Sequence, residues 1–314
     1  MNNTPDWERE LITKLAGSAL FEQRRARQWK IFFRLAWLLV TLIIVFSLFI
    51  NRDKSGKDGS LMDGKHTALI SLDGVINSEN DTADRLARGL EAAYKDSGTR
   101  GIIIRANSPG GSPVLSGMAY DEIRRLKKQY PAIPVVTVVE EVCASGCYYI
   151  AAATDRIYAD KASIIGSIGV LSEGFGFTGT MEKLGVERRL MTSGNNKGMG
   201  DPFSPVKPEQ EAIRQQLLDT VHQQFIQAVR DGRGKRLQQA NAEIFSGRVW
   251  LGSQSQPLGL IDGLSSVRQV AREQFKAEKL VEFTPDEGFG KRAARLLGVQ
   301  FAQGMGSLFD TRYY

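Results

Sequence analysis

The first of three candidate catalytic elements in this chain is a serine. Ser145 lies between Ala144 and Gly146, after a run of β-branched residues over 135–139. The run predicts a buried strand, and the small residues after Ser145 continue as a helix-like segment. A serine at such a junction is held on a rigid turn, and the backbone N–H groups that follow it point toward the same space. This pattern is typical of a nucleophile.

Two adjacent glycines are the second chemical element. Gly110 and Gly111 follow Asn107-Ser108-Pro109 at the end of an expected strand. Glycine adopts positive φ at little cost and leaves its N–H open to a ligand. Beside a reactive serine, such N–H groups stabilise a developing oxyanion. On its own the pair is more typical of a simple tight turn, so its chemical interpretation depends on Ser145.

A lysine in an uncharged loop is the third element. Lys197 stands in the sequence SGNNKG over 193–198, and the chain has only two histidines, His66 and His222. Lysines are usually solvated surface charges, and a lysine acts as a base only where burial lowers its pKa. His222 lies beside the apolar stripe of an expected helix, where a structural or exposed role is expected. A serine activated without a histidine leaves a Ser–Lys arrangement.

The elements that must position these residues alternate between strands and helices. The patterns predict strands over 67–72, 101–105, 135–139, 156–159 and 163–170, and helices over 82–96, 114–128 and 209–229. Such alternation predicts an α/β domain with a largely parallel sheet. Residues 191–208 are rich in Gly, Asn, Ser and Pro and form a long expected loop.

The two cysteines, Cys143 and Cys147, flank the serine. In an oxidising compartment a pair invites a disulfide. A bridge between them would close almost no loop. We therefore interpret them as small buried hydrophobic residues beside the site.

The N-terminal part of the chain has the features of a membrane anchor. Residues 31–50 are apolar or small except for Arg34, and about 20 such residues match the hydrocarbon thickness of a bilayer. Seven Lys/Arg against four acidic residues precede or begin this stretch, which predicts a cytoplasmic N-terminus and an exported remainder. A cleaved signal peptide is the alternative, but the stretch is long for one and lacks an Ala-x-Ala ending.

Composition narrows the remaining classes of function. The 314 residues are 42% hydrophobic and 24% charged, with a net charge of +6 of which half lies before residue 35. No later patch combines clustered Lys/Arg with stacking aromatics, which argues against nucleic-acid binding. With two histidines only, the sequence favours no metal site and no cofactor.

Several motifs in a fixed order resemble one family. They are Asn107-Ser-Pro-Gly-Gly111, Ala144-Ser-Gly146, Gly166-Ser-Ile-Gly169, Ser193-Gly-Asn-Asn-Lys197 followed by Ser204-Pro205, and Gly247-Arg-Val-Trp-Leu-Gly252 with Gly259-Leu-Ile-Asp262. Together they resemble the bacterial signal peptide peptidase A family in its short, single-repeat, membrane-anchored form, over roughly residues 67–280. The resemblance implies a crotonase- and Clp-protease-like α/β fold, a repeated β-β-α superhelix.

The resemblance also implies a role for each site residue. Ser145 would be the nucleophile and Lys197 the base, with Ser167 orienting the lysine amine. The N–H groups of Gly111 and Gly146 would line the oxyanion hole, with Gly110 as an alternative to Gly111. Apolar residues near the site are candidates for pockets, although each is also typical of plain core: Val114, Leu115, Met118, Ile164, Ile168 and Val170.

The implied function is hydrolysis of remnant signal peptides and other hydrophobic peptides at the bacterial inner membrane, with the catalytic domain in the periplasm. The implied partners are peptide substrates, lipid and further copies of the chain, with serine and lysine contributed by neighbouring subunits. The expected organisation is a cytoplasmic N-terminal segment (1–30), a transmembrane helix (31–50), a linker (51–64), a peptidase domain (65–284) and a basic tail (285–314).

Two alternatives stay open at this point. A crotonase-like acyl-CoA enzyme would share the fold and the oxyanion hole, but an exported domain lacks access to CoA and Lys197 would have no role. A catalytically silent membrane scaffold would bind peptides in the same groove. The basic tail, with Lys291, Arg292 and Arg295 near Leu296, could contact lipid or the assembly's own groove, or be a disordered end.

Overall fold

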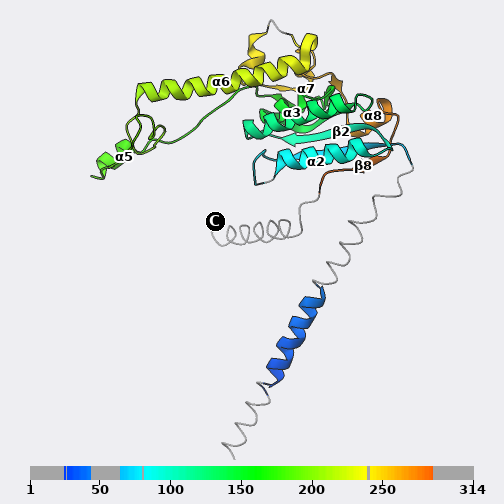
Figure 1. Cartoon of the computed structure of the whole chain (residues 1–314), viewed down its shortest axis with the longest axis horizontal. Coiled ribbons are helices and arrows are strands. Elements are labelled where there is room, and N and C mark those ends of the chain that lie inside the picture. The colour runs from blue at the N-terminus through cyan, green and yellow to red at the C-terminus, as the bar shows by residue number, and fades with distance from the viewer. Residues whose placement is uncertain (1–24, 26, 44–63, 80, 239–240, 286–314) are drawn as a thin grey trace, which may run out of the picture. The chain divides into compact units, whose positions relative to one another are not determined.

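The computed structural model describes residues 25, 27–43, 64–79, 81–238 and 241–285 (Figure 1). It divides into two units, residues 1–63 and 64–314, and we describe each by itself. In the first unit, residues 27–43 are helical. Within the described ranges, we find no helix with the length and apolar character needed to cross a bilayer. The expected span over 31–50 is described only up to residue 43. The expected N-terminal segment (1–30), linker (51–64) and tail (285–314) lie almost wholly outside the described residues.

A largely parallel sheet is the centre of the second unit. Its described strands follow the order β6-β5-β3-β2-β1-β8, with β4 paired to β3 and to β7. The strands are β1 (His66–Asp73), β2 (Thr99–Ser108), β3 (Val135–Ala144), β4 (Arg156–Ala159), β5 (Ile164–Gly166), β6 (Val249–Leu251), β7 (Gly263–Leu264) and β8 (Leu280–Glu282). The pairing of β5 with β6 is antiparallel, and the other pairings are parallel. The prediction of an α/β domain with a mainly parallel sheet is confirmed.

Helices cover the two faces of this sheet unequally. The described helices are α2 (Thr82–Lys95), α3 (Pro113–Gln129), α4 (Gly146–Ala151), α5 (Thr178–Lys183), α6 (Pro208–Arg233), α7 (Gly252–Ser255) and α8 (Val267–Glu273), with 3-10 turns at Gly234–Arg236 and Ala242–Phe245. Alternate residues of each strand point to opposite faces. In β1, Ile70 packs in the larger core cluster with α2, α3, α4 and α6, whereas Leu69 packs in a smaller cluster under α8.

Strand β3 is shared between two neighbours, and this fork places the site. Its first part pairs with β4 over Val136–Val139, and its last three residues pair with β5. On its other side, Cys143 is in register with Ser108 at the end of β2. The carboxyl ends of β2, β3 and β5 therefore meet, and the turns that follow them lie together. The predicted strand over 163–170 is shorter than expected, because Ser167 adopts a φ of 51° that ends β5.

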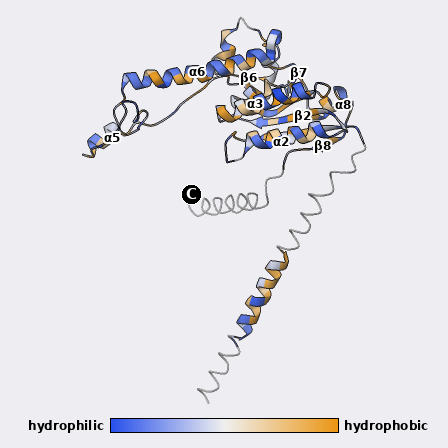
Figure 2. Ribbon diagram, viewed as in Figure 1, coloured by the Kyte–Doolittle hydropathy of each residue, from blue (hydrophilic) through white to orange (hydrophobic). Residues whose placement is uncertain are grey.

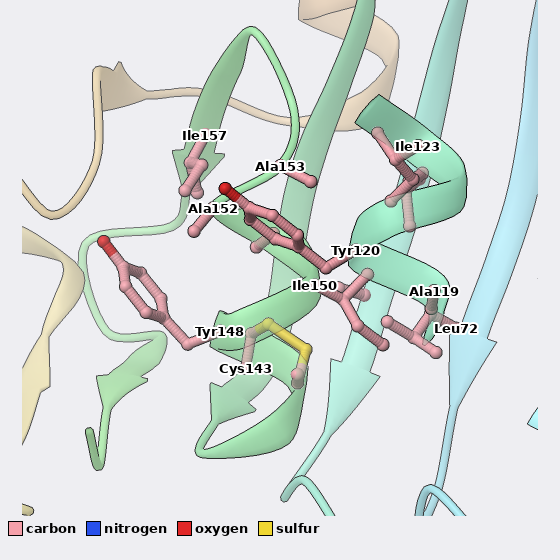
Figure 3. Packing of buried hydrophobic residues seen from close by; sticks show 14 of the residues in the cluster. Leu72, Ala119, Tyr120, Ile123, Cys143, Tyr148, Ile150, Ala152, Ala153 and Ile157 are labelled. Carbon is pink, nitrogen blue, oxygen red and sulfur yellow. A yellow bond between two sulfur atoms is a disulfide. The ribbon is translucent and has the colours of Figure 1, made fainter. Parts of the chain in front are cut away.

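The cysteines differ from the prediction. Cys143 and Cys147 form a disulfide, and both are fully buried (Figure 3). Cys143 is the second-last residue of β3, and Cys147 lies in the first turn of α4. The chain reverses at Ser145, which brings the two Cα atoms to 5.1 Å, within the range that a disulfide spans. The interpretation of the two residues as unlinked hydrophobes is wrong, although their burial is as expected.

A long segment between β5 and α6 leaves the core. We call residues 171–207, which include α5, the arm. The arm lies along the first half of α6: Arg214 donates to Ser172 Oγ at 3.0 Å, and Gln210 Nε2 donates to the carbonyl of Asn195 at 3.1 Å. Figure 1 shows α5 beside the N-terminal end of α6 and away from the sheet. The helix predicted over 209–229 is confirmed, and Figure 2 shows hydrophobic and hydrophilic residues mixed along its whole length.

Candidate active site

Ser145 stands at the turn between β3 and α4 as predicted. Its backbone has φ 52° and ψ −123°, a conformation that residues with a Cβ rarely adopt. Two backbone bonds hold it there: the Ser145 N–H donates to Gly166 O at 2.8 Å, and the Tyr149 N–H donates to Ser145 O at 3.0 Å. The side chain is half-buried. A strained, well-held serine at the end of a central strand is the arrangement of an exposed nucleophile.

Two backbone amides lie close together beside this serine. Gly146 is the first residue of α4, so its N–H has no acceptor within the helix. A Cβ built on Gly146 would lie 3.3 Å from the Gly111 nitrogen and would collide with Ser116 Oγ. Among the described residues, neither glycine amide donates to a backbone carbonyl. Both N–H groups are therefore open to an oxyanion.

The geometry separates Gly111 from its alternative. The Gly110 N–H donates to Ser108 Oγ at 3.1 Å, so it is already engaged. Gly110 has φ 101° and packs tightly on the nucleophile turn, because a Cβ there would come within 2.7 Å of Ala144 O. Gly111 is fixed from behind by Ile76, whose N–H and C=O bond the residues on either side of it. Gly110 thus shapes the turn, and Gly111 is the better candidate for the oxyanion donor.

Ser145 lines a cavity of about 550 Å³. Its lining comes from the three turns after β2, β3 and β5, from α6 and from the segment before β6: Pro109, Gly111, Pro113, Ser145, Gly146, Tyr149, Ser167, Gly169, Val170, Leu171, Val221, Phe225, Ser246 and Gly247. The lining thus combines the Ser145 hydroxyl, open amides and apolar side chains, which suits an extended, largely apolar ligand.

Of the six apolar residues proposed for pockets, one, Val170, lines the cavity, and the other five do not. Ile168 is fully buried core, and Leu115 packs partly buried against the same core cluster. Val114 and Met118 are 68% and 58% exposed on the outer face of α3. The last of the six, the half-exposed isoleucine 164, lies on β5 outside the cavity lining.

Two aromatic residues that the sequence analysis did not predict, Tyr149 and Phe225, line the cavity. Tyr149 stacks on Phe225 with ring centroids 4.9 Å apart and meets Tyr120 edge-on at 5.4 Å. Burial raises the pKa of Tyr149, with a smaller contribution from the charge of Asp121, so its phenol stays protonated near neutral pH and cannot serve as a base. Tyr149 sits one helical turn after Ser145, and that spacing is the signal that could have found it.

Ser167 is brought to the cavity, as the resemblance implies. It lies next to the carbonyl of Gly166 that accepts the Ser145 N–H, and its own N–H donates to Arg248 O at 2.8 Å. His222 has a structural contact, since its Nε2 lies 3.0 Å from Ile168 O, and it is not part of the cavity lining. The expectation of a non-catalytic role for His222 fits this position.

Lys197 is not brought to Ser145 within one chain. It is exposed and is absent from the cavity lining. Its loop is tied to the first turn of α6 through Asn195 and Gln210, whereas Val221 of the same helix lines the cavity. Eleven residues of α-helix separate Gln210 from Val221, roughly 16 Å along the axis. Among the residues that line the cavity there is no lysine, histidine or acidic side chain.

Comparison with known proteins identifies the family. The model of Peptidase family S49 matches residues 127–282, which include Ser145, Ser167 and Lys197. Two relatives have names that mark their activity as putative. A signal peptide peptidase SppA of Enterococcus faecium is 31% identical over 229 residues, covering 70% of this chain and 66% of the relative. A protease of Synechocystis sp. is 31% identical over 202 residues, covering 64% of this chain and 70% of the relative.

The chain belongs to peptidase family S49, a family of serine peptidases. The resemblance to the signal peptide peptidase A family is confirmed. A third relative, from Brucella abortus, is named a Na⁺/H⁺ antiporter NhaA and is 42% identical over 200 residues. Those residues are 63% of this chain but 27% of the antiporter, so this chain spans about a quarter of that relative. The antiporter's name therefore says nothing of what this chain does.

Proposed function

We propose that this S49 member is a membrane-anchored serine endopeptidase that hydrolyses hydrophobic peptides, including remnant signal peptides, through an acyl-enzyme on Ser145. The observation that carries the proposal is the site at the end of β3. There, a strained serine faces two open amides at the edge of an apolar cavity. An uncharged, apolar cavity favours peptides with apolar side chains over charged ones.

The proposed mechanism is acyl transfer to the serine with a lysine as the general base. A neutral lysine amine removes the proton from Ser145 Oγ as the oxygen attacks the scissile carbonyl. The N–H groups of Gly111 and Gly146 stabilise the oxyanion of the tetrahedral intermediate. The protonated amine then gives its proton to the leaving amine of the peptide, and the acyl-enzyme forms. Water, deprotonated by the same amine, releases the acid product and regenerates Ser145.

A second copy of the chain would supply the amine. In one chain, about three turns of α6 separate the attachment of the Lys197 loop from the cavity at Ser145, and the residues that line this cavity include no base. A lysine amine becomes a base where burial disfavours its charged form. We propose that the arm of one subunit packs against the next and inserts Lys197 beside its Ser145 and Ser167. The exposed apolar side chains of the arm, such as Leu171, Phe175 and Met191, support such an assembly.

The cellular placement and the finer fold are part of the same proposal. The apolar stretch over 31–50 would anchor the chain in the bacterial inner membrane with the N-terminus in the cytoplasm. A disulfide within the catalytic unit supports an exported, oxidising location such as the periplasm. The turns that end successive parallel strands at one site support the crotonase- and Clp-protease-like superhelix.

The test is serine-directed labelling and peptide-library digestion with the full-length protein in lipid nanodiscs. Ser145→Ala is expected to lose labelling and at least about a thousandfold in peptide turnover. The matched control is Ser97→Ala, an exposed serine before β2 at the opposite end of the sheet, which is expected to retain both. Peptide hydrolysis by Ser145→Ala at the wild-type rate would refute the assignment.

One observation favours a second candidate, a catalytically silent peptide-binding scaffold. The single-chain cavity contains a hydroxyl and open amides but no base. If the wild-type protein binds apolar peptides and is never labelled at Ser145, the scaffold function is correct. Membership of family S49 gives the acyl-CoA alternative no support.

A further inference from the structure

The buried disulfide brackets the candidate nucleophile. Cys143 is the second residue before Ser145 and Cys147 the second after it, so the bond joins the end of β3 to the first turn of α4. Figure 3 shows the sulfur–sulfur bond between the strand and the helix, beside Tyr148 and Ile150. The proposed mechanism uses neither cysteine.

The turn inside this bracket is held against its own preference. Ser145 has a positive φ without being glycine, and such a conformation persists only where the surroundings enforce it. The Ser145 N–H bonds to Gly166 on β5, so that bond fixes the turn to a neighbouring strand. The bond from Tyr149 to Ser145 O fixes the start of α4. Only the disulfide, among the described contacts of the turn, covalently joins its two ends.

We propose that the Cys143–Cys147 disulfide is a positioning element that keeps Ser145 in its strained conformation and aims the Gly146 amide at the oxyanion. The inference rests on the proposed function of Ser145. A bridge between residues four apart closes a small ring, so it restricts the unfolded chain less than a long-range bridge does. Its main effect is therefore local, on the geometry of the turn.

Burial decides when the bond forms. Both cysteines are 0% exposed, so an external thiol or disulfide cannot reach either sulfur in the folded protein. The bond must form while α4 is still unpacked. One cysteine thiolate attacks the disulfide of an exported dithiol–disulfide oxidoreductase, and the other cysteine displaces the carrier from the mixed disulfide. The carrier leaves as a dithiol with the two electrons and two protons that the cysteines lose.

The first arm of the test counts thiols. The chain has no other cysteine, so alkylation in denaturant without reductant reports this pair alone. Full-length protein from an oxidising compartment is expected to take up no alkyl group, and to take up two after reduction in denaturant. A reductant added to the folded protein is expected to leave the count at zero. Two free thiols in the untreated protein would overturn the proposal.

The second arm measures the turn itself. The variant Cys143→Ala/Cys147→Ala removes the bond and both thiols. We expect its rate of serine labelling and its kcat to fall at least tenfold, with KM changed less than twofold. Hydrogen exchange of residues 145–149 is expected to quicken, with the rest of the sheet unchanged. The matched control is Ile123→Val, a buried change in α3 that loosens the same core without touching the turn and is expected to keep the wild-type labelling rate.

The outcomes separate this inference from the function it rests on. If wild-type Ser145 is labelled and the double variant matches it in rate and exchange, the positioning role is wrong and the proposed function stands. If wild-type Ser145 is never labelled, the proposed function fails, and the exchange of residues 145–149 still decides whether the disulfide holds the turn. A loss of labelling shared by Ile123→Val would show a general loss of stability and would also overturn the proposal.

Discussion

The proposed nucleophile and the proposed base lie in two regions of this chain, and these regions are built in opposite ways. The turn with Ser145 is fixed to the core: the residues that flank it at the end of β3 and the start of α4 are buried, and a disulfide joins them. The arm with Lys197 is exposed, and large apolar side chains such as Met191, at 94% exposed, face outward. The turn is packed within a single copy, whereas the arm leaves large apolar side chains uncovered.

The difference teaches how the two halves of a Ser–Lys pair are made ready. A nucleophile and an oxyanion hole need fixed geometry, which a packed sheet edge supplies. A lysine base needs burial, which an exposed arm lacks until it is covered. Under the proposed function, separating the two regions would couple activity to assembly, because neither region alone would give a reactive serine.

Complementation between two inactive variants tests this separation most severely. Ser145→Ala and Lys197→Ala are each expected to be inactive, and their mixture active, because the second chain keeps its serine and the first its lysine. In random 1:1 mixing about one site in four pairs an intact serine with an intact lysine from the neighbour in a closed ring. Peptide turnover after co-assembly measures the fraction.

The control is each variant assembled alone, with the size of the assembly checked by light scattering. A mixture that stays as inactive as its parts would show that the base does not come from another copy. Full turnover by Lys197→Ala alone would remove the lysine from the mechanism.

Crowding at the oxyanion hole gives the next largest effect. Gly146→Ala would drive its Cβ into Ser116 Oγ and crowd the Gly111 nitrogen at 3.3 Å. Loss of a well-placed oxyanion donor costs about 10²–10³ in kcat, so we expect a decrease of that order in peptide turnover. The matched control is Gly117→Ala in α3, where the added Cβ finds its nearest neighbour at 4.0 Å. An equal loss in both variants would contradict the geometry.

Local signals explain why this end of the site was predictable. A β-branched strand, a serine and small residues in sequence describe β3, the turn and α4, and Gly110 and Gly111 reveal the neighbouring turn. These residues owe their positions to the strands that they end, and parallel strands bring such turns together.

Tertiary packing hid the rest. Val221 and Phe225 line the cavity from α6, although they follow Ser145 by 76 and 80 residues in the sequence, so no local pattern joins them to the serine. Val114 and Met118 were proposed as pocket residues because they are apolar and near the site in sequence, yet α3 buries Ser116 and Ala119 and turns those two outward. The disulfide was missed because a bridge that closes almost no loop gains little from chain entropy, whereas the turn between β3 and α4 brings the two cysteines to within bonding distance.

Matched ion pairs sharpen the comparison in free energy. In the core, Arg233 is 1% exposed and bonds Asp262 at 2.7 Å. In the arm, Arg188 lies 3.3 Å from Asp201 and is half-exposed. Arg233→Met is expected to lower the free energy of unfolding by about 2 kcal/mol, since it removes the buried donor of the Gly259 carbonyl and one of the two arginines that pair with Asp262. Arg188→Met is expected to cost less than about 1 kcal/mol. Denaturant unfolding measures both, and similar losses would contradict the contrast.

The two halves of α6 provide the same contrast within one helix. Val229 is fully buried in the core cluster, and Leu217 is 57% exposed beside the arm. Val229→Ala is expected to cost about 2 kcal/mol of unfolding free energy, and Leu217→Ala less than about 0.5 kcal/mol in the dissociated chain. If Leu217→Ala destabilises only the assembled protein, the exposed half of α6 is an assembly surface. Equal costs in dilute, dissociated protein would place both halves in one core.

The smallest expected effect is on the pH dependence of unfolding, through two aspartates, one in the core and one in the arm, whose pKa values are both lowered. Burial of Asp262 acts to raise its pKa, but the hydrogen bond and charge of Arg233 outweigh it and hold the pKa below the ordinary 3.8. The stability that Asp262 contributes is therefore fully present above about pH 4 and is lost as the pH falls through its lower folded value. The Ser204 hydroxyl lowers the pKa of Asp201 in the arm. Asp262→Asn is expected to flatten the acid limb of global unfolding below pH 4, because its ion pair with Arg233 lies in the core. We expect the exposed arm to open locally before the core does, so Asp201→Asn is expected to leave that limb unchanged. An acid limb that responds equally to both variants would show that arm and core unfold as one unit, and the separation of the two regions would be lost.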